Sequence, residues 1–516
     1  MRQARLEAKG SIKNINRPVL SLIRLEYEDR IWEWDDADEM LSDFQRVFDE
    51  IDPDIVLTKK GDGHVFPLLL ASAKAARFPL CLDRADSPKD RRIEVEGQTY
   101  HAYGQVKYKQ PDYDLFGRWH LDEGNSFWVS HTGLEGLAES ARVGGVPIQR
   151  GSRRSIGTGI TAVQLAEAWR RQVLVPWKKT EPEGWKTANV ILKTDRGGLV
   201  YAPRCGFYEN IVELDFASMY PSIMTNYNIS PETINAPEGG ARRVPEIFYR
   251  IASRRGLVSQ ALEPLISKRQ KLKRLRSLSE QDNDKEAHKR FDHRQDELKW
   301  MLVCCFGYLG YKNARFGRIE AHEAVSALSR ELLTRAQEIC INAGWSMLHA
   351  NVDCVWIQKD QWDENEIDDL IESINDVTEL SISLEGIYKW IGFLPSRQTK
   401  NRPVPTRYFG AFRSGKLKYR GIEARRHDMP DFIRNVQIDF LNQLAEASTA
   451  SEYQKIARGL RPQMEEFESM LWQNEVPLDE LVLKTVLTQD PQDYKSNAPS
   501  ALAARQAMKA GLTYHA

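Results

Sequence analysis

The sequence has few cysteines and no long apolar run. Its cysteines stand at positions 81, 205, 304, 305, 340 and 354, in no CxxC pair and with no histidines at zinc-ligand spacing. This spacing argues against a disulfide framework and a structural zinc site, and it predicts a reducing, cytoplasmic environment. No stretch reaches 18 apolar residues and the N-terminus MRQARLEAKG is charged, so neither a membrane span nor a signal peptide is expected.

The chain also lacks an excess of either charge. Its 72 Lys and Arg residues almost balance its 73 Asp and Glu residues, which gives a net charge of -1. A uniformly basic surface is therefore excluded, and any nucleic-acid site must be a local basic patch. A length of 516 residues predicts several domains rather than one core.

The most informative stretch is residues 211–229, IVELDFASMYPSIMTNYNI. In an extended strand the period of two puts Val212 and Leu214 on one face and Glu213 and Asp215 on the other. The strand is expected to pack on its apolar face and to present Asp215 at its end, where a helical turn begins. The plainer alternative is a strand that ends in a solvated acid.

A second acid follows in residues 345–358, WSMLHANVDCVWIQ. This stretch predicts two strands around a tight turn at residues 350–353. If the strand alternation continues there, Asn351 and Asp353 point the same way. The alternative is an ordinary hairpin with one exposed acid.

Two basic helices are predicted between these acids, over residues 264–276 and 285–305, joined as an antiparallel hairpin. Arg269 and Lys273 are four residues apart and share a face of the first helix, and Lys299 lies on the second. A basic helix is usually a solvated surface, but two facing basic helices between acid-bearing strands favour binding of a triphosphate.

The N-terminal part predicts an α/β layer. Residues 18–35 alternate like two strands, an amphipathic helix is expected over 37–51, a strand over 55–58 and an apolar helix from Leu68. Asp62 and Asp122 are interpreted as solvated loop residues. His120 with Asp122 could form a metal pair, but a structural role is favoured because no third ligand is evident.

Asp215 to Ile223, DFASMYPSI, closely resembles the first catalytic motif of family B DNA polymerases. Lys299 to Gly307 resembles the second motif, with Val303 and Phe306 replacing Asn and Tyr. Asn351 to Cys354 resembles the Asp-Thr-Asp-Ser motif, with Asn351 replacing the first Asp. The departures look most like the second, exonuclease-deficient archaeal branch and its bacterial relatives.

The resemblance implies an α/β multidomain right-hand polymerase with palm, fingers and thumb and an N-terminal degenerate RNase H-like exonuclease domain. The second exonuclease motif is altered at Lys60 and Val65, no Asp-x-Glu stands near the N-terminus, and Tyr108 to Asp112 is interpreted as a turn because it contains Pro111. Proofreading is therefore not expected. The expected domains are the N-terminal and degenerate exonuclease-like domain at 1–175, the first part of the palm at 176–255, the fingers hairpin at 256–306, the second part of the palm at 307–428 and the thumb at 429–516.

Site residues follow from the same resemblance. The implied catalytic residues are Asp215, Asp353 and Lys299, and the implied metal ligands are Asp215, Asp353 and the backbone carbonyl of Phe216. The implied nucleotide contacts are Ser218, Met219, Tyr220, Arg269, Lys273, Lys299 and Val303.

DNA contacts are expected in two stretches that interleave basic and aromatic residues, a composition typical of a groove that follows phosphates. The alternative for the second stretch is an ordinary solvated hairpin. The candidate residues are Tyr308, Gly310 and Arg315 in the first stretch and Arg407, Tyr408, Lys416, Lys418, Arg420, Arg425 and Arg426 in the second.

The expected function is template-directed addition of dNTPs to a primer 3′-hydroxyl by two-metal-ion phosphoryl transfer, without 3′-5′ proofreading, in DNA repair or translesion synthesis. Two Mg²⁺ ions are the expected cofactors, with Mn²⁺ as a substitute. Expected partners are primed DNA template and dNTPs, with a sliding clamp or repair proteins as further candidates. No contact with a membrane is expected, and the expected location is the nucleoid. A catalytically weak or inactive nucleic-acid-binding accessory protein is the alternative, favoured by Asn351 and Val303. A nuclease that uses Asp62 and Asp122 is a third hypothesis.

Overall fold

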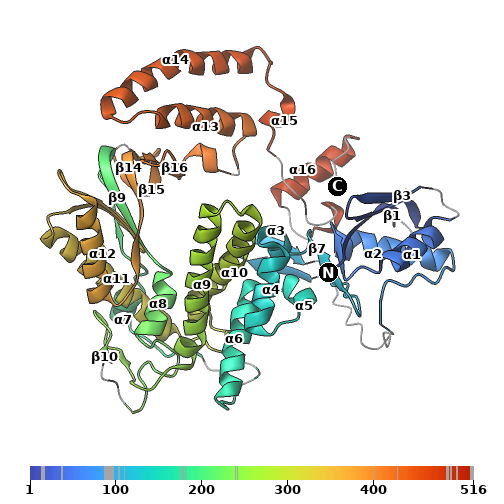
Figure 1. Cartoon of the computed structure of the whole chain (residues 1–516), viewed down its shortest axis with the longest axis horizontal. Helices are drawn as coiled ribbons and strands as arrows, with labels where there is room; N and C mark the ends of the chain where they lie inside the picture. Colours follow the sequence, from blue (N-terminus) through green and yellow to red (C-terminus); the bar gives the residue numbers. More distant parts are fainter. Residues whose placement is uncertain are drawn as a thin grey trace. The chain divides into compact units, whose positions relative to one another are not determined.

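The computed structural model in Figure 1 describes residues 1–12, 18–35, 39–85, 98–102, 105–109, 111–175, 177, 179, 182–238, 240, 242–399, 401–426, 428–483, 487, 491–494 and 498–511. The chain forms two compact units. Unit 1 comprises Met1–Pro176, Glu263–Cys305 and Leu487–Ala516, and unit 2 comprises Trp177–Leu262 and Phe306–Val486. Each unit is described by itself below.

Unit 1 contains a five-stranded sheet in the order β3-β2-β1-β4-β7. The strands are β1 (Gln3–Ser11), β2 (Val19–Tyr27), β3 (Arg30–Trp34), β4 (Ile55–Thr58) and β7 (Trp119–Asp122). The first three are antiparallel, whereas β4 and β7 continue parallel to β1. Apolar side chains at alternate positions of β1 and β2 pack on α1 (Met40–Ile51) and α2 (Phe66–Ala75) to form one core. The α/β layer predicted from the sequence is confirmed.

Smaller elements complete this part of unit 1. They are a two-stranded ribbon of β5 (Gln98–Ala102) and β6 (Gln105–Lys109), a π-helical turn at Gly61–Val65, and the helices α3 (Phe127–His131), α4 (Gly133–Gly144), α5 (Ile148–Ser152), α6 (Ile156–Arg170) and α16 (Pro499–Lys509). Tyr108 was expected in a turn but lies in β6, which ends at Lys109. Position 110, inside that predicted turn, falls outside the described residues.

The basic hairpin consists of α9 (Leu257–Gln281) and α10 (Lys285–Gly310), which lie side by side in Figure 1. Arg276 and Asp292 form an ion pair between them at 2.8 Å. Both helices are longer than predicted, and α10 continues through residues 307–310, which were expected to start a loop. The helix continues there because Leu309 is buried and extends its apolar face.

Buried acids join this hairpin to α4. Glu139 of α4 has no exposed surface and pairs with Lys268 of α9 and with Arg294 of α10, the latter at 2.8 Å. Burial raises the pKa of Glu139, but its bonds to Lys268 and Arg294 outweigh burial and hold the pKa below its usual value. Two basic residues of the hairpin, Lys268 and Arg294, therefore hold it against α4.

Glu297 of α10 is a second buried acid, and it predicts a pH dependence of stability. It accepts a hydrogen bond from Thr132 Oγ1 at 2.9 Å, and burial raises its pKa to about 8. The folded chain thus keeps this proton up to about pH 8, whereas the unfolded chain releases it near its usual pKa of about 4.3. The free energy of unfolding should therefore fall by a few kcal/mol as the pH rises between these values.

Denaturation of wild type and a Glu297→Gln variant across pH 5 to 9 measures this effect. The variant should lose the part of the pH slope that belongs to Glu297. Glu286→Gln, an exposed acid on the same helix, serves as the matched control and should keep the wild-type slope. Equal slopes in all three proteins would contradict the prediction.

Unit 2 contains a seven-stranded antiparallel sheet in the order β16-β15-β14-β9-β13-β12-β8. Its strands are β8 (Val200–Tyr201), β9 (Gly206–Phe216), β12 (Ser346–Asn351), β13 (Cys354–Gln358), β14 (Ile382–Pro395), β15 (Pro403–Phe412) and β16 (Leu417–Arg420). The helices are α7 (Ala188–Thr194), α8 (Met219–Asn226), α11 (Ile319–Asn342) and α12 (Glu364–Thr378), and a short ribbon pairs β10 (Arg242–Arg243) with β11 (Arg250–Ile251). The central strand β9 is thereby held on both sides.

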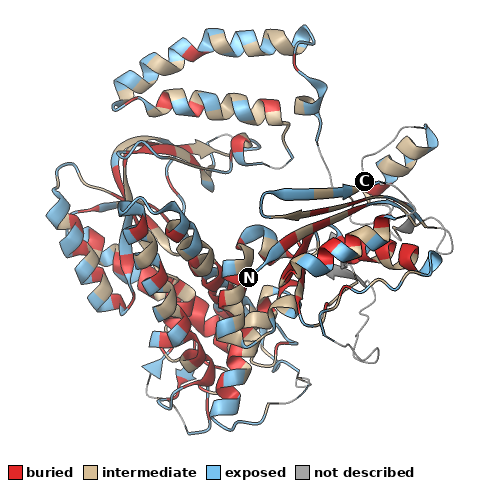
Figure 2. Cartoon of the chain, turned by 45° about the vertical axis from the view of Figure 1, so that its right-hand side comes forward, coloured by how far each residue is buried: buried red, intermediate tan, exposed pale blue. Residues whose placement is uncertain are grey.

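The C-terminal part of unit 2 is helical. α13 (Asp431–Ala445) and α14 (Ala450–Trp472) pack against each other, and α15 (Leu478–Leu481) follows. Leu444 and Leu460 pack on Trp390 of β14. Figure 2 shows α14 as mostly exposed and intermediate in burial, with Leu460 as its buried residue. Across the described residues, no helix combines the length and apolar character needed to cross a membrane.

Candidate active site

Asp215 and Asp353 come together because β9 and β13 are neighbours. Asp215 at the end of β9 lies opposite Cys354, the first residue of β13. The backbone N–H of Phe216 donates to the backbone carbonyl of Asp353 at 2.8 Å. After Phe216 the chain turns into α8, and Ser218 takes the left-handed conformation with φ of 51° at this turn. The two acids of the sequence motifs are thus placed side by side by strand pairing.

The turn that carries Asp353 is strained. Val352 has a φ of 61°, a conformation that is unfavourable for a β-branched residue. Two backbone hydrogen bonds fix it, from Val352 N–H to the Leu199 carbonyl at 3.0 Å and from Asp353 N–H to the Asn351 carbonyl at 2.7 Å. Because Val352 is not extended, the strand alternation used to orient Asn351 with Asp353 does not apply across this turn.

Asp215, Asp353 and Cys354 form a group able to hold a metal ion. One ligand atom from each lies within 4.8 Å of the others, and no other such group of three occurs in the described part of the chain. The Cys354 thiol donates to Asp215 Oδ1 at 3.0 Å and lies 3.7 Å from Asp353 Oδ1. Cys354 was not predicted as a site residue, although its place opposite Asp215 in the strand register was the available signal.

The electrostatics of this group favour a cation. Burial, followed by the charge of Asp353, raises the pKa of Asp215 to about 6. Burial also raises the pKa of Asp353, and burial together with both carboxylates raises that of the Cys354 thiol, so the thiol keeps its proton. Two carboxylates that repel one another in a partly buried site are the donor set that Mg²⁺ or Mn²⁺ prefers. These residues fit a divalent ion.

A buried charge pair supports the sheet beneath the acids. Glu213 of β9 accepts hydrogen bonds from Tyr388 Oη and from Lys418 Nζ, each at 2.7 Å. Burial opposes the charge on Lys418, but Glu213 raises the Lys418 pKa to about 12. Lys418 also lies 3.3 Å from Glu385. Its ammonium group is therefore paired with the buried Glu213 and the exposed Glu385, and its role as a DNA contact remains a prediction.

The side chains of Tyr408 and Met219, two other predicted site residues, are buried. Tyr408 is 5% exposed and packs edge-to-face on Trp356, so its ring belongs to the core. Met219 is 2% exposed, so its side chain is not available to a nucleotide. Both positions were predicted from motifs whose apolar members fill the core as well as a site.

Tyr220 stands at the surface of unit 2 on α8. It is half-buried, and its ring lies 4.2 Å from that of Phe306, which in turn stacks on His322 at 4.1 Å. Phe306 is the residue that replaces Tyr in the second motif. The two rings, Tyr220 from α8 and Phe306 from α10, are tilted by 48° to each other and form an aromatic contact beside the helix that follows Asp215.

The predicted triphosphate contacts lie in unit 1. Lys299 pairs with Asp296 at 3.6 Å and keeps 52% of its side chain exposed, and Val303 is 56% exposed one turn further along α10. On α9, Lys273 is exposed and Arg269 is half-buried. Three of these four residues carry positive charge, and the fourth, Val303, leaves an apolar side chain in solvent.

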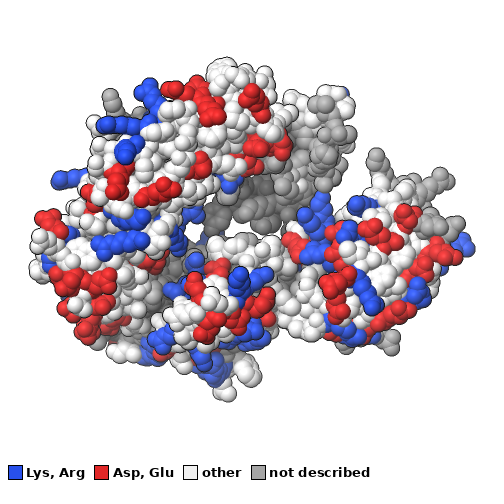
Figure 3. Space-filling view, turned by 45° about the horizontal axis from the view of Figure 1, so that its top comes forward, with Lys and Arg blue, Asp and Glu red and all other residues white. Residues whose placement is uncertain are grey.

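The remaining DNA candidates lie in unit 2. Lys416, Arg420 and Arg425 are exposed. Other members of the set have internal partners, since Arg407 donates to the Pro395 carbonyl at 2.6 Å and Arg426 pairs with Asp428 at 2.6 Å. Tyr308 and Gly310 are half-buried on the last turn of α10, and the Arg315 guanidinium lies over Trp177. On the face seen in Figure 3, basic and acidic side chains are mixed.

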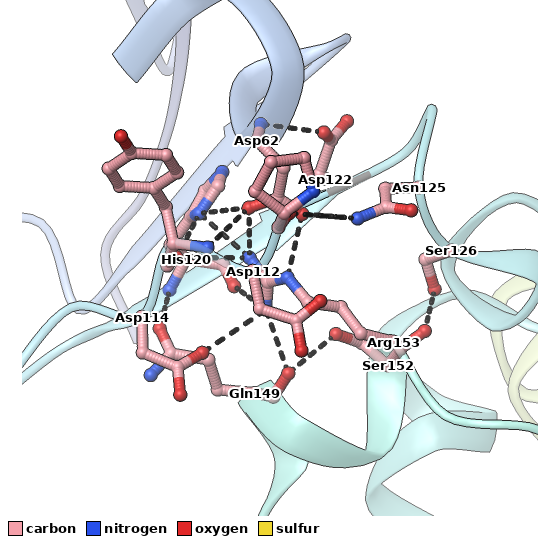
Figure 4. A network of polar contacts seen from close by, with 12 residues as sticks. Asp62, Asp112, Asp114, His120, Asp122, Asn125, Ser126, Gln149, Ser152 and Arg153 are labelled. Atoms are coloured by element: carbon pink, nitrogen blue, oxygen red, sulfur yellow. Dashed lines mark hydrogen bonds and ion pairs between the residues drawn. The ribbon is translucent and has the colours of Figure 1, made fainter. Parts of the chain in front are cut away.

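The acids of the N-terminal part are not solvated as predicted. Asp62 is fully buried and pairs with Arg153, whose Nε and Nη2 lie 2.7 and 3.0 Å from its oxygens (Figure 4). Asp122 is also buried and accepts from the backbone N–H groups of Lys60, Asp62 and Gly124 at 2.8 to 2.9 Å. An arginine and backbone amides thus satisfy the acids that the sequence analysis placed in solvent.

His120 does not form a metal pair with Asp122. Its ring is buried against Thr58 Oγ1 at 2.8 Å and the Tyr113 carbonyl at 2.7 Å. Burial, together with the charge of Arg153, lowers its pKa to about 4, so the ring is neutral. The structural interpretation of this histidine is confirmed.

Comparisons with known proteins identify the family of this chain. The family model for DNA polymerase family B matches residues 154–388 and 365–513. DNA polymerase 2 of Saccharolobus solfataricus is 32% identical over 327 residues, which cover 63% of this chain and 48% of that protein. DNA polymerase 1 of Pyrococcus abyssi is 26% identical over 525 residues, 92% of this chain and 65% of that protein. The chain thus spans less than two thirds of these relatives.

The fold agrees as well. The structure of the family B DNA polymerase from Pyrobaculum calidifontis superposes with a TM-score of 0.65 at 20% identity, over 100% of this chain and 71% of that one. The family model covers the strands that carry Asp215 and Asp353 and most of the chain. The predicted family is confirmed, and the chain belongs to DNA polymerase family B.

Proposed function

We propose that this protein is a template-directed DNA polymerase that adds dNTPs to a primer 3′-hydroxyl. The observation that carries the proposal is the convergence of Asp215 and Asp353 at the junction of β9 and β13. Divalent ions, Mg²⁺ with Mn²⁺ as a substitute, would activate the hydroxyl and neutralise the leaving pyrophosphate when bound there. Asp215, Asp353 and the carbonyl of Phe216 are the residues that would hold them.

In this proposal residues 176–255 and 307–428 form a palm, 256–306 the fingers and 429–516 a thumb. The antiparallel sheet that bears both acids supports the palm, and the α9–α10 hairpin supports the fingers. Arg269, Lys273 and Lys299 bind the triphosphate, because cationic donors balance the charge that metal ions leave. Ser218 and Met219 contribute through the backbone of the turn into α8.

Tyr220 and Phe306 line the sugar side of the nucleotide site in this proposal. Their rings lie 4.2 Å apart, and Phe306 is fixed by stacking on His322. A rigid aromatic surface at the 2′ position leaves no room for a hydroxyl, so deoxynucleotides are the proposed substrates.

Absence of proofreading is a further part of the proposal. Exonuclease chemistry by metal ions needs carboxylates that are free to ligate. Residues 1–175 are the proposed degenerate RNase H-like exonuclease domain. In this domain Asp62 is paired with Arg153, and Asp122 accepts hydrogen bonds from three backbone amides. The same contacts argue against the nuclease hypothesis, and they are compatible with a role in repair or translesion synthesis.

Val303 carries a prediction about nucleotide selection. It stands exposed on α10 where the family motif has Asn, and a valine side chain makes no hydrogen bond. A Val303→Asn variant should add nucleotides faster or select them more strictly, by about threefold to tenfold, because one polar contact contributes about 0.5–1.5 kcal/mol. Single-nucleotide kinetics measure both quantities. Identical kinetics for variant and wild type would refute the prediction.

Primer extension tests the proposed function. Wild-type protein, primed template, Mg²⁺ and all four dNTPs should give extended primer. If primed template is bound but never extended, the protein is the nucleic-acid-binding accessory that Asn351 suggests. Primed DNA and dNTPs are the proposed partners of an active enzyme at the nucleoid in the cytoplasm, with a sliding clamp or repair proteins as further candidates.

A further inference from the structure

Two tryptophans of unit 2 are exposed. Trp177 is 80% exposed and Trp185 is 104% exposed. Indole rings are large apolar groups that folded proteins usually cover at least in part. These two exposed rings indicate a surface that a binding partner covers.

Both tryptophans stand beside lysines that are anchored to the body of unit 2. Lys179 Nζ donates to the Gly317 carbonyl at 2.6 Å. Lys186 Nζ bonds both carboxylate oxygens of Glu323 at 2.8 Å, and Tyr249 Oη donates to the same carboxylate at 2.6 Å. The side chains of Lys179 and Lys186, which follow the two tryptophans in sequence, are thus bonded to the body of unit 2.

Positive charge accompanies the Trp177 ring. The Arg315 guanidinium lies 5.2 Å from the centre of the Trp177 ring. Lys312 and Tyr311 are exposed in the same segment, residues 311–317. Aromatic faces beside cations bind single-stranded nucleic acid, because bases stack on the rings while Lys and Arg balance the phosphates. The cation beside Trp177 favours this partner over an apolar protein surface.

We propose that Trp177, Trp185 and the segment 311–317 bind the unpaired part of a nucleic-acid strand. The inference rests on the proposed polymerase function, in which that strand is the template ahead of the primer end. Each indole stacks on one base, and Arg315 and Lys312 lie along the phosphates. Affinity should therefore depend on the length of the unpaired strand.

Fluorescence anisotropy with two labelled primed templates tests this. Both share one duplex, and their 5′ overhangs are about 2 and about 15 nucleotides long, the second long enough for several stacked bases. Wild type should bind the long overhang more tightly. A Trp177→Ala/Trp185→Ala variant should lose at least about fivefold of that gain and bind the short overhang unchanged. A Trp177→Phe/Trp185→Phe variant keeps two rings and should retain most of it.

Trp169→Ala is the matched control, because Trp169 is 84% exposed and lies in unit 1. It should bind both DNAs as wild type does. The inference is overturned if the double alanine variant matches wild type on the long overhang, which would assign the indoles to a protein partner. It is equally overturned if that variant loses affinity for both DNAs alike, or if wild type gains nothing from the long overhang. Wild type that binds and extends the short overhang keeps the proposed function intact in each case.

Discussion

An Asp353→Asn variant is expected to lose primer extension almost completely, by at least about 10³-fold in rate, a loss of about 4 kcal/mol in transition-state stabilisation. Asp353 and Asp215 supply the two carboxylates of the candidate site, and the neighbouring Cys354 thiol remains protonated. The substitution keeps the shape of the side chain but removes one charge. Because Asn351 already replaces an acid nearby, no spare carboxylate in the turn can compensate.

Single-turnover extension of a primed template measures this loss, and anisotropy on the same DNA checks that binding persists. Asp360→Asn is the matched control, since Asp360 is an exposed acid just after β13. It should extend primers at the wild-type rate. Full activity in the Asp353→Asn variant would show that the site described around Asp215 is not catalytic.

An Arg153→Met variant is expected to destabilise unit 1 by about 3–5 kcal/mol near neutral pH. Arg153 is the charge partner of Asp62, and both side chains are almost fully buried. The substitution leaves a carboxylate in the interior without a cation. It also removes donors to the Tyr113 and Gln149 carbonyls, at 3.1 and 2.8 Å.

The loss should depend on pH in a defined direction. In the wild type, Arg153 overcomes the effect of burial and holds the pKa of Asp62 below its usual value. In the variant the hydrogen bonds from Asn125 and the Tyr113 N–H remain, but without Arg153 we expect burial to raise that pKa, so that Asp62 becomes neutral in mildly acidic solution. The stability difference between the two proteins should therefore be largest at pH 7 to 8 and shrink toward pH 4 to 5.

Calorimetry of the full chain measures the effect on the unfolding transition of unit 1. An Asp62→Asn/Arg153→Met double variant is the control, because it removes the unpaired charge as well. It should be more stable than Arg153→Met alone. If the double variant is no more stable than the single one, lost packing and not the buried charge explains the effect.

Elements whose residues show a clear local periodicity could be predicted from the sequence. The alternation in residues 211–216 predicted β9, and the motif acids Asp215 and Asp353 do meet. The basic hairpin was predicted because Pro264 to Cys305 reads as two helices broken by polar residues. In each case the determining residues are neighbours in sequence or belong to a motif of known order.

Sequence reasoning failed where the deciding partner is distant. Asp62 was expected to be a solvated loop residue, whereas its partner Arg153 lies 91 residues away in the chain. The pairing of Lys418 with Glu213, which is 205 residues away, was not predicted either. Periodicity cannot reveal such pairs, because burial of a charge is decided by tertiary packing.

The contacts of Glu139 limit how the polymerase parts could be exchanged between relatives. Lys268 and Arg294 of the hairpin both form ion pairs with this buried carboxylate of α4. Glu297 of the hairpin also accepts a hydrogen bond from Thr132, which directly precedes α4. A hairpin transplanted without α4 would expose these charges without their partner, and a foreign hairpin placed on α4 would leave Glu139 buried and unpaired. The unit of exchange in a chimaera is thus α4 together with α9 and α10.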